Sequence, residues 1–375
     1  IPFSKLDTFE DDEDLTEYLR MRSYLLADQP DRKGRRKWIP LPRKKARPAI
    51  KHAPVAPAID PQTLADEVAS LAPSAKLDKS GDLSVYVARA RRVPNVLQEL
   101  GRLREITFRA ADEGTGQPTD LDRFDYYYLH LFVWNEAKKE IVGAYRLGPS
   151  DVILRRYGKR GFYTHTLFRY RSKLIKDINP ALELGRSFVR PEYQRSYSSL
   201  LMLWKGIGAF VVRHPRYRHL VGPVSINDEY KDLSQWMIMA FLRAHTYLPA
   251  LAKLTKPKNP PKFRPPRNWD DVAVADFVDD IDDVNSLISE IETDQKGVPI
   301  LIKQYLKLGA RLLAFNVDPA FGQCLDGLMV CDLVQADRRI LKHYMGKEGS
   351  QRFLDYHAKH QTRSPADTPA PAEVG

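Results

Sequence analysis

The most constraining feature of this chain is the stretch from residue 182 to residue 211, where an expected strand gives way to an expected helix. Leu182–Val189 has strand character, and Pro191 interrupts it. Apolar residues then recur at the spacing of one helical face, at Leu200, Leu201, Trp204, Ile207, Gly208 and Val211. We therefore expect a helix that begins near Ser196.

The start of this helix is a candidate anion site. Its first amides have no acceptors within the helix and carry the positive end of the helix dipole, while Arg190 and Arg195 add full charges. The residues expected to hold an anionic phosphate group are Val189, Arg190, Arg195, Ser196, Ser198 and Ser199. The alternative is an ordinary helix that Ser196 or Ser198 caps, with two solvated arginines beside it.

Charge and length narrow the classes of partner. The chain has 375 residues, enough for two domains, and a formal charge of +11 that favours nucleic acid, an anionic membrane surface or an acidic carrier protein as partner. The two cysteines, Cys324 and Cys331, indicate neither a disulfide framework nor a thiolate metal site, so we expect no metal and a reducing compartment.

No apolar run approaches the roughly 20 residues that cross a bilayer, so we expect no membrane span. The chain opens on Ile1-Pro2-Phe3, without a basic and then apolar leader. We interpret it as a fragment or processed product without a signal peptide.

The first 62 residues divide by composition. Residues 1–28 combine an acidic cluster with a short helical pattern, and residues 29–62 form an expected basic, proline-rich linker. Between Asp31 and His52 ten lysines and arginines face one acid. Because each cation near an anionic leaflet contributes about 1 kcal/mol of attraction, this arm is a candidate membrane contact; a solvated linker is the alternative.

The remaining pattern alternates helices with strands. We expect a helix from Pro61 to Leu71, a strand over Leu83–Ala88, a helix over Pro94–Phe108 and a hairpin turning at Asn135–Lys139. Further expected elements are a strand over Arg218–Ser225, a helix over Leu233–Leu254, irregular structure over Lys256–Arg267, an acidic helix within Asp270–Asp294, a helix over Pro299–Leu308, strands over Leu312–Phe315 and Leu328–Leu333, and a disordered tail over 361–375.

Several short motifs in this order resemble GNAT-superfamily acyltransferases that make aminolipids, the hemolysin-like ornithine- and glycine-lipid N-acyltransferases. The motifs are Leu103-Arg104-Glu105-Ile106-Thr107-Phe108, Asp122-Arg123-Phe124-Asp125, Ile141-Val142-Gly143-Ala144-Tyr145-Arg146-Leu147, Glu183-Leu184-Gly185-Arg186-Ser187-Phe188-Val189, and Pro299 to Tyr305 with Gly309-Ala310. The set Arg104, Asp122, Asp125, Arg146, Glu183 and Arg186 also resembles acyl-homoserine lactone synthases.

The resemblance implies an α/β (α+β) fold, with a GNAT-like mixed, mostly antiparallel central sheet flanked by helices and a C-terminal α/β extension. It implies a core over 63–255, a proline-rich basic loop over 256–269 and a C-terminal part over 270–360. Residues 1–28 resemble the end of a glycerolipid (lysophospholipid) O-acyltransferase domain. No histidine is followed by aspartate five positions later, so the active-site pattern of that class is missing.

The resemblance also implies chemistry: the α-amine of an amino acid attacks an acyl thioester directly. Glu183 is then the expected base, Asp122 and Asp125 hold or deprotonate the ammonium, and Arg104, Arg146 and Arg186 bind the acceptor carboxylate or organise the acids. The acyl donor is acyl carrier protein or acyl-CoA, and no cofactor is tightly bound. The product is a lyso-aminolipid, made on the inner face of the cytoplasmic membrane, with no role for nucleic acid.

Two departures from the superfamily pattern stand out. The segment from Gln194 to Ser199 contains no glycine, so its backbone is less suited to close on a pyrophosphate, which favours the single phosphate of a carrier protein. Glu183 and Arg186 are three residues apart and would face opposite sides of a regular strand, so either a bulge lies near Gly185 or only one of them lines the site.

Structural roles compete with each of these assignments. His130 is more typical of a packed histidine with one hydrogen bond, and Asp122 and Asp125 of capping residues. Arg146 and Glu183 are equally compatible with a buried structural bridge, and the segment from Trp236 to Phe241 with a core helix in place of an acyl tunnel. At the level of function, the alternatives are O-acylation of a lysolipid and an inactive basic scaffold that binds membranes.

Overall fold

The computed structural model describes residues 52–262 and 280–361, together with residues 12, 15, 16, 18–20 and 23. The domain assignments to 1–28, most of 29–62 and 361–375, and the basic arm, therefore lie almost entirely outside the described residues. The chain divides into two compact units. The larger comprises 52–229, 246–261 and 301–375, and the smaller includes 230–245 and 262–300.

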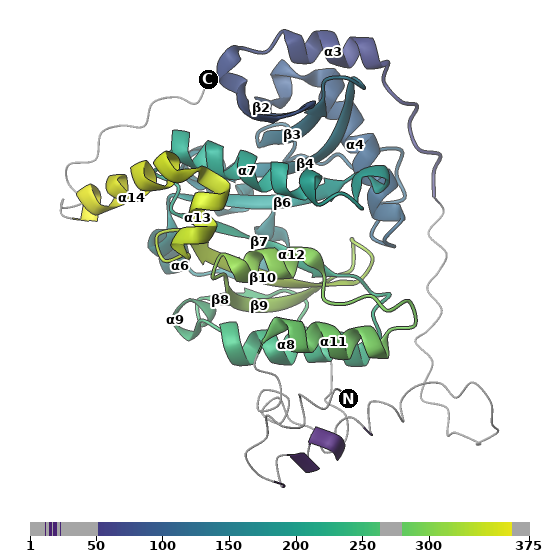
Figure 1. Ribbon diagram of the computed structural model, residues 1–375, viewed down its shortest axis with the longest axis vertical. Helices are drawn as coiled ribbons and strands as arrows, with labels where there is room; N and C mark the ends of the chain where they lie inside the picture. The colour runs from purple at the N-terminus through teal and green to yellow at the C-terminus, as the bar shows by residue number, and fades with distance from the viewer. Residues whose placement is uncertain are drawn as a thin grey trace. The chain divides into compact units, whose positions relative to one another are not determined.

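An eight-stranded sheet in the order β1-β2-β3-β4-β6-β7-β10-β9 forms the larger unit (Figure 1). All neighbours are antiparallel except β6 and β7. The strands are β1 (Lys76–Ser80), β2 (Leu83–Arg89), β3 (Leu129–Asn135), β4 (Glu140–Pro149), β6 (Ala181–Val189), β7 (His219–Ile226), β9 (Arg311–Asp318) and β10 (Cys324–Asp332). The expected mixed, mostly antiparallel sheet flanked by helices is confirmed.

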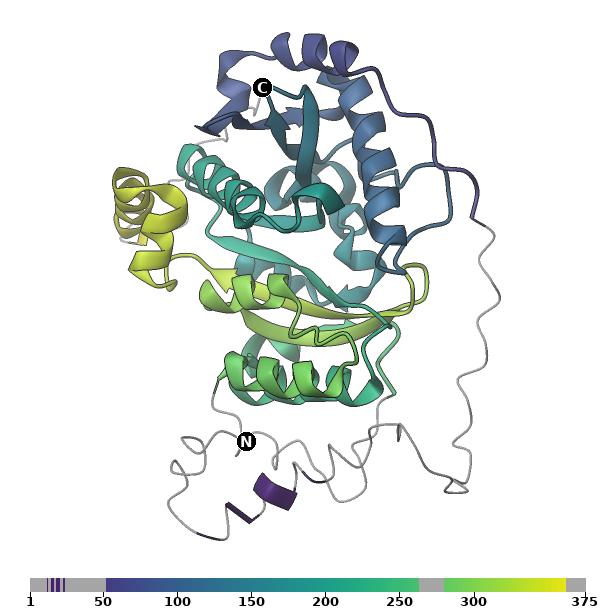
Figure 2. The ribbon, with the colours of Figure 1, turned by 45° about the vertical axis from the view of Figure 1, so that its right-hand side comes forward.

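Helices cover both faces of this sheet (Figure 2). On one face α4 packs through Phe108 near Ala144 and Phe188; on the other α7 packs Trp204 against Tyr145. The helices of this unit are α3 (Pro61–Ala69), α4 (Pro94–Arg109), α5 (Ser150–Tyr157), α6 (Ser172–Ile178), α7 (Tyr197–Arg213), α9 (Pro249–Ala252), α12 (Ile300–Lys307, from its second residue), α13 (Arg338–Met345) and α14 (Lys347–Gln361).

Local sequence explains where several elements begin and turn. Asp60 caps α3 by accepting from the Thr63 amide at 2.9 Å, and Pro61 occupies the first turn, as expected. In the β3–β4 hairpin Asn135 Oδ1 accepts from the amides of Ala137 and Lys138 at 3.1 and 3.0 Å, which fixes the turn. The predicted hairpin is therefore confirmed.

The expected bulge in β6 is present. Ala144 lies opposite Phe188 but Arg146 lies opposite Gly185, so β6 has one residue more than β4 between these pairs. Arg186 lies within the bulge and has a φ of 48°, in the left-handed region. The bulge turns Arg186 to the face of the sheet that also carries Arg146, so Glu183 and Arg186 share a face despite their spacing.

The parallel pair β6 and β7 is short. Only Ala181–Glu183 pairs, with His219–Val221, and beyond this point the two strands no longer pair with each other. The chain leaves the end of β6 through the turn η5 (Pro191–Tyr193) and enters α7. The sheet therefore opens between β6 and β7 at the carboxyl ends of these strands.

The smaller unit contains α8 (Asp232–Thr246, up to His245) and α11 (Ile281–Ile291). The amide of Lys231 donates to Glu292 Oε1 at 2.9 Å, and the Tyr230 hydroxyl donates to the carbonyl of Gly297 at 2.7 Å. Trp236 through Phe241 is at most 5% exposed, which supports the core-helix interpretation. The helix expected within 270–294 is present in its described part.

Three expectations about elements were wrong or incomplete. The helix over Leu233–Leu254 is two helices, because Pro249 cannot continue the first and Tyr247 bridges to Leu312 of β9. Residues 256 and 257 are not irregular: they belong to β8 (Thr255–Pro257), which pairs with β5 (Phe168–Tyr170). The sequence patterns also missed β1, α5 and α6, which are short or polar.

We predict that Gly222→Ala destabilises the protein by about 1–3 kcal/mol. A Cβ at this position would lie 2.3 Å from the backbone oxygen of Leu184 on β6, so the two strands would have to separate. Urea unfolding of the full chain measures the effect. Gly185→Ala is the matched control, because no atom lies within 4 Å of its added Cβ. Equal stability of the two variants would contradict the prediction.

Candidate active site

A pocket of about 130 Å³ lies where β6 and β7 separate. Strand alternation assigns Tyr145 and Leu184 to the α7 face of the sheet, and Arg186, Ser225 and Asp326 to the opposite face. The lining of the pocket thus comes from both faces of the sheet. Its lining residues are Phe108, Glu113, Tyr145, Tyr163, Leu184, Gly185, Arg186, Ser187, Pro223, Ser225, Leu301, Tyr305, Phe321 and Asp326.

Two acids of this pocket have unusual environments. Asp326 on β10 is 2% exposed; its Oδ1 accepts from Ser225 Oγ at 2.7 Å, while its Oδ2 has no hydrogen-bond partner among the described residues. Burial raises the pKa of Asp326 to about 7, and nearby Asp318 adds to the shift. Burial and the charge of Asp326 raise the pKa of Glu113 to about 8. Both groups therefore exchange protons near neutral pH.

Arg186 forms a cationic wall of the pocket. Its guanidinium lies over the rings of Tyr163 and Phe321, at 5.0 and 4.8 Å from their centroids. Its Nε lies 3.2 Å from Asp120 Oδ2 and a terminal nitrogen lies 3.7 Å from Asp122 Oδ2. The side chain is therefore held in place on both sides, with its charge close to the pocket acids.

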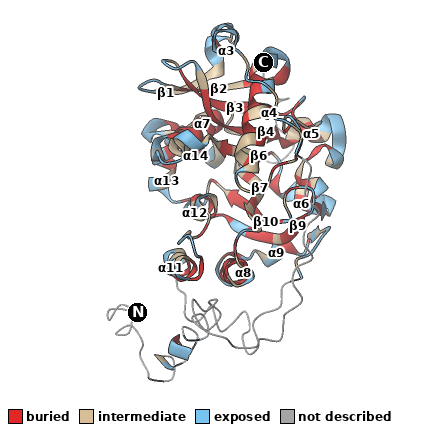
Figure 3. Ribbon diagram, turned by 90° about the vertical axis from the view of Figure 1, so that its right-hand side faces the viewer, coloured by how far each residue is buried: buried red, intermediate tan, exposed pale blue. Residues whose placement is uncertain are grey.

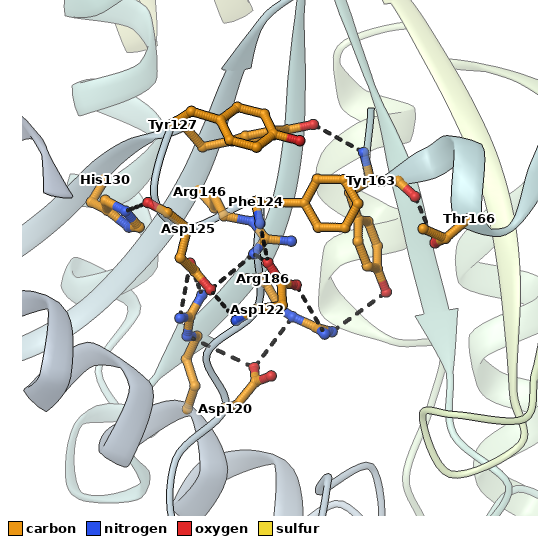
Figure 4. Close-up of polar contacts among 12 residues, drawn as sticks. Asp120, Asp122, Phe124, Asp125, Tyr127, His130, Arg146, Tyr163, Thr166 and Arg186 are labelled. Carbon is orange, nitrogen blue, oxygen red and sulfur yellow. Dashed lines mark hydrogen bonds and ion pairs between the residues drawn. The ribbon is translucent and has the colours of Figure 1, made fainter. Parts of the chain in front are cut away.

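Behind Arg186, charges of opposite sign alternate through the interior (Figure 4). Arg146 lies 2.7 Å from Asp122 and 3.2 Å from Asp125, and Arg104 lies 3.0 Å from Asp125. Despite burial, the two arginines hold the pKa of Asp125 well below its usual range. We call this series of alternating charges the arginine–aspartate network; its members are Arg104, Asp125, Arg146, Asp122, Arg186 and Asp120.

The network changes the expected roles of its members. Arg104 and Arg146 are 2% and 1% exposed and do not line the pocket, so the geometry does not support their expected contact with a substrate carboxylate. Their charges are satisfied by aspartates. The proposed bridge between Arg146 and Glu183 is also wrong, because Arg146 pairs with Asp122 and Asp125. Of the three expected acceptor-binding arginines, only Arg186 reaches the pocket.

Asp122 and Asp125 hold their own loop in shape, as the capping alternative predicts. Asp122 Oδ1 accepts from the amide of Phe124, and Asp125 Oδ2 accepts from the amide of Asp122, both at 2.8 Å. Neither residue lines the pocket. With both engaged by arginines and amides, they are unsuited to taking a proton from a substrate.

Glu183 is sealed in the interior, contrary to the expected role as base. It is 1% exposed, accepts from the amide of Thr164 at 2.7 Å and from the hydroxyl of Tyr128, and does not line the pocket. Burial raises its pKa. Glu183 therefore joins β6 to the segment around Thr164 and to Tyr128.

His130 is a packed histidine, as the structural alternative predicts. Its Nε2 lies 2.8 Å from the carbonyl oxygen of Asp125, to which an N–H at this position would donate. Burial lowers the pKa of His130 to about 4, so the ring is neutral at pH 7. A ring with so low a pKa is a weak base, and its Nε2 is already engaged with the carbonyl of Asp125.

The expected helix start is confirmed, since Ser196 is the N-cap of α7. Arg195, Ser196 and Ser198 are exposed, and Ser199 is buried. Arg190 is not a free cation: it lies 2.6 Å from Glu140 and 3.3 Å from Glu192, which weakens its expected contact with a phosphate. The residues of this turn and Val189 are not among those lining the pocket.

Other classes of site find no support in the described part of the chain. It contains no group of three or more histidine, cysteine, aspartate or glutamate residues arranged to hold a metal ion. Cys324 and Cys331 are buried and unpaired by disulfides. None of the described helices is long and apolar enough to cross a bilayer.

Sequence reasoning missed Glu113, Tyr163, Ser225 and Asp326. Asp326 was available as a signal, since it interrupts the apolar run of β10, but the expected strand began at Leu328 and excluded it. Glu113 lies in a loop after α4, where an acidic residue is common and predicts no particular role. Only the closure of the sheet brings these two residues to one pocket.

We predict that Arg146→Met lowers the free energy of unfolding by about 3–5 kcal/mol, because Asp122 and Asp125 lose their shared cation in the interior. Urea unfolding measures the loss. Arg195→Met, at an exposed position beside α7, is the control and should leave stability unchanged. An Arg146→Met protein as stable as the control would show that the network does not hold the fold together.

Comparisons with known proteins agree with this architecture. The family model described as acetyltransferase (GNAT) domain matches residues 103–205. A glycine N(alpha)-acyltransferase of Bacteroides thetaiotaomicron is 31% identical over 299 residues, which cover 75% of this chain and 85% of that protein. An L-ornithine N(alpha)-acyltransferase of Agrobacterium fabrum is 26% identical, covering 71% of this chain and 86% of that protein.

A solved structure of a CoA-dependent acyl-homoserine lactone synthase, MesI, covers 70% of this chain and 95% of its own, with 11% identity and a TM-score of 0.33. A likeness this weak adds nothing to the assignment. The sequence relatives and the match to the GNAT domain are sufficient to assign the family. They agree with the family expected from the short motifs. The chain belongs to the GNAT-type N(alpha)-acyltransferases of amino acids.

Proposed function

We propose that this enzyme transfers a long-chain (3-hydroxy)acyl group from acyl carrier protein to the α-amine of an amino acid, giving a lyso-aminolipid. The observation that carries the proposal is the pocket between β6 and β7, whose lining comes from both faces of the sheet and includes Asp326, Glu113 and Arg186. Donor and acceptor would then approach from opposite faces and meet at this pocket.

Asp326 is the proton acceptor in this proposal. Its unpartnered Oδ2 takes a proton from the α-ammonium of the acceptor, and the free amine attacks the thioester carbonyl carbon. The new C–N bond forms, the C–S bond breaks, and the second amine proton passes to the leaving sulfur. Glu113 and Ser225 complete the polar surroundings of the ammonium, while Arg186 attracts the acceptor carboxylate.

The acceptor is a small amino acid in this proposal. The small volume of the pocket, about 130 Å³, favours an acceptor with a short side chain. The names of the relatives point to glycine and ornithine, and both belong in the assay. Glycine fits the volume more easily, whereas the two acids would favour the second ammonium group of ornithine.

The donor side of the proposal uses the start of α7. The first amides of this helix, with the exposed residues Arg195, Ser196 and Ser198, would receive the phosphate of a phosphopantetheine arm, and Val189 is the last residue of β6 before the same turn. The absence of glycine from 194–199 favours a carrier protein over coenzyme A. Acyl-CoA is the second candidate donor. We place the reaction at the inner surface of the cytoplasmic membrane, where its product would accumulate.

We predict that Asp326→Asn lowers kcat by about 10²–10⁴-fold in an assay with acylated carrier protein and glycine or ornithine, read by mass spectrometry. Glu183→Gln is the comparison variant, because it keeps the acceptor oxygen for Thr164 and should retain activity within about tenfold. Circular dichroism checks that both fold. Loss of product in the Glu183 variant alone would return the role of base to that residue.

The pH dependence gives a separate test. Only ionised Asp326 can accept a proton, so kcat/KM should rise as pH increases through about 7, the raised pKa of this carboxyl. The rise should be absent in Asp326→Asn. A wild-type profile flat from pH 5 to 8 would argue against a titrating carboxyl in the pocket.

A further inference from the structure

A second surface of the larger unit is strongly basic. Between residues 155 and 176 the chain has eight lysines and arginines and no acid. Seven of the eight are exposed, and Lys159 is half-buried. The next acid, Asp177, lies 3.0 Å from Lys173 and offsets only one charge. We call these eight cations, with Arg123 and Lys258, the basic face.

The fold gathers these cations from several short elements. Burial lowers the pKa of His165, and the charges of Lys258, Lys159, Arg160 and Arg169 lower it further, so all four lie near one ring. Lys159 Nζ lies 3.2 Å from Ser172 Oγ at the start of α6. Figure 3 shows α5 and α6 along one edge, with exposed residues on both. Four of the cations therefore gather around His165, and the others lie on α5, on α6 and in the segments beside these helices.

Two exposed tyrosines lie on the chain segments that carry these cations. Tyr126 is 71% exposed and Tyr157 is 46% exposed, high values for large aromatic side chains. Tyr157 lies against Tyr127, with ring centroids 4.2 Å apart, and Arg123, three residues before Tyr126, donates to the carbonyl of Arg160 at 3.4 Å. The tyrosines thus add exposed rings with polar tips to the segments that carry the cations.

We propose that the basic face binds the surface of an anionic bilayer. Tyrosines prefer the headgroup level of a membrane, and lysines and arginines are attracted by anionic lipids. The core of a protein interface is depleted in charged residues, whereas this face consists mostly of exposed cations, which favours lipid over an acidic protein. The inference rests on the proposed function, since it places the site of lyso-aminolipid synthesis against the membrane.

The test uses the full chain and sedimentation with vesicles of phosphatidylglycerol and phosphatidylcholine, compared with pure phosphatidylcholine. The triple variant Arg155→Gln, Arg156→Gln, Arg160→Gln should weaken binding to the anionic vesicles by about tenfold or more. The matched control replaces three exposed cations of α13 and α14, Arg338→Gln, Lys342→Gln and Arg352→Gln, and should bind like the wild type.

A second variant, Tyr126→Ser with Tyr157→Ser, keeps the charge and should also weaken vesicle binding. Transfer from a soluble short-chain acyl thioester should be unchanged in every variant, which separates membrane binding from the proposed chemistry. If the α13–α14 control lost vesicle binding to the same extent, net charge alone would explain the effect, and the proposal would be overturned. Unchanged vesicle binding with lost affinity for acyl carrier protein would make this face a protein-docking surface instead.

Discussion

The ion pairs of Arg146 with Asp122 and Asp125 hold together the parts that make the site. Arg146 belongs to the central strand β4, and the two aspartates belong to the loop between α4 and β3. Through Asp122 and Asp120 the same loop reaches Arg186 at the bulge of β6. Removing two charges from water costs several kcal/mol each, so such a network is stable only when every member is paired.

The ion pairs of the network also define where chemistry is possible. The charges that face one another in the interior cannot serve a substrate, which directs attention to the groups at its margin. Arg186 ends the network at the pocket, and Asp326 and Glu113 lie across from it with pKa values raised toward neutrality. In our account the network orients Arg186 and the bulge, while the acids outside it exchange protons with the acceptor.

The sequence predicted much of the fold because its patterns are local. The Asp60 cap, the Asn135 turn and the apolar face of α7 each depend on residues within a few positions. The spacing of Glu183 and Arg186 left two alternatives, a bulge near Gly185 or a site lined by only one of them; β6 has the bulge, and only Arg186 lines the pocket. The missed elements, such as α5 and α6, are short and carry many exposed cations, so they have little apolar periodicity to detect.

The site was harder to predict, because it depends on which charges meet in space. The motif residues Arg104, Arg146 and Glu183 were expected to act on substrates, but the fold buries them with partners of their own. Asp326 comes from β10, more than 130 residues after Glu183 in the chain, and only the strand order places the two near the same opening. Neither spacing nor composition contains that information.

The most direct measurement is the pKa of the Asp326 carboxyl. Carbon NMR on protein with labelled aspartate follows the titration, and comparison with Asp326→Asn assigns the signal. We predict that this carboxyl titrates near pH 7 in the free enzyme. Its pKa should fall when the amino-acid acceptor binds, because the ammonium then lies beside the carboxylate. A carboxyl that titrates near pH 4 and does not respond to the acceptor would contradict the account.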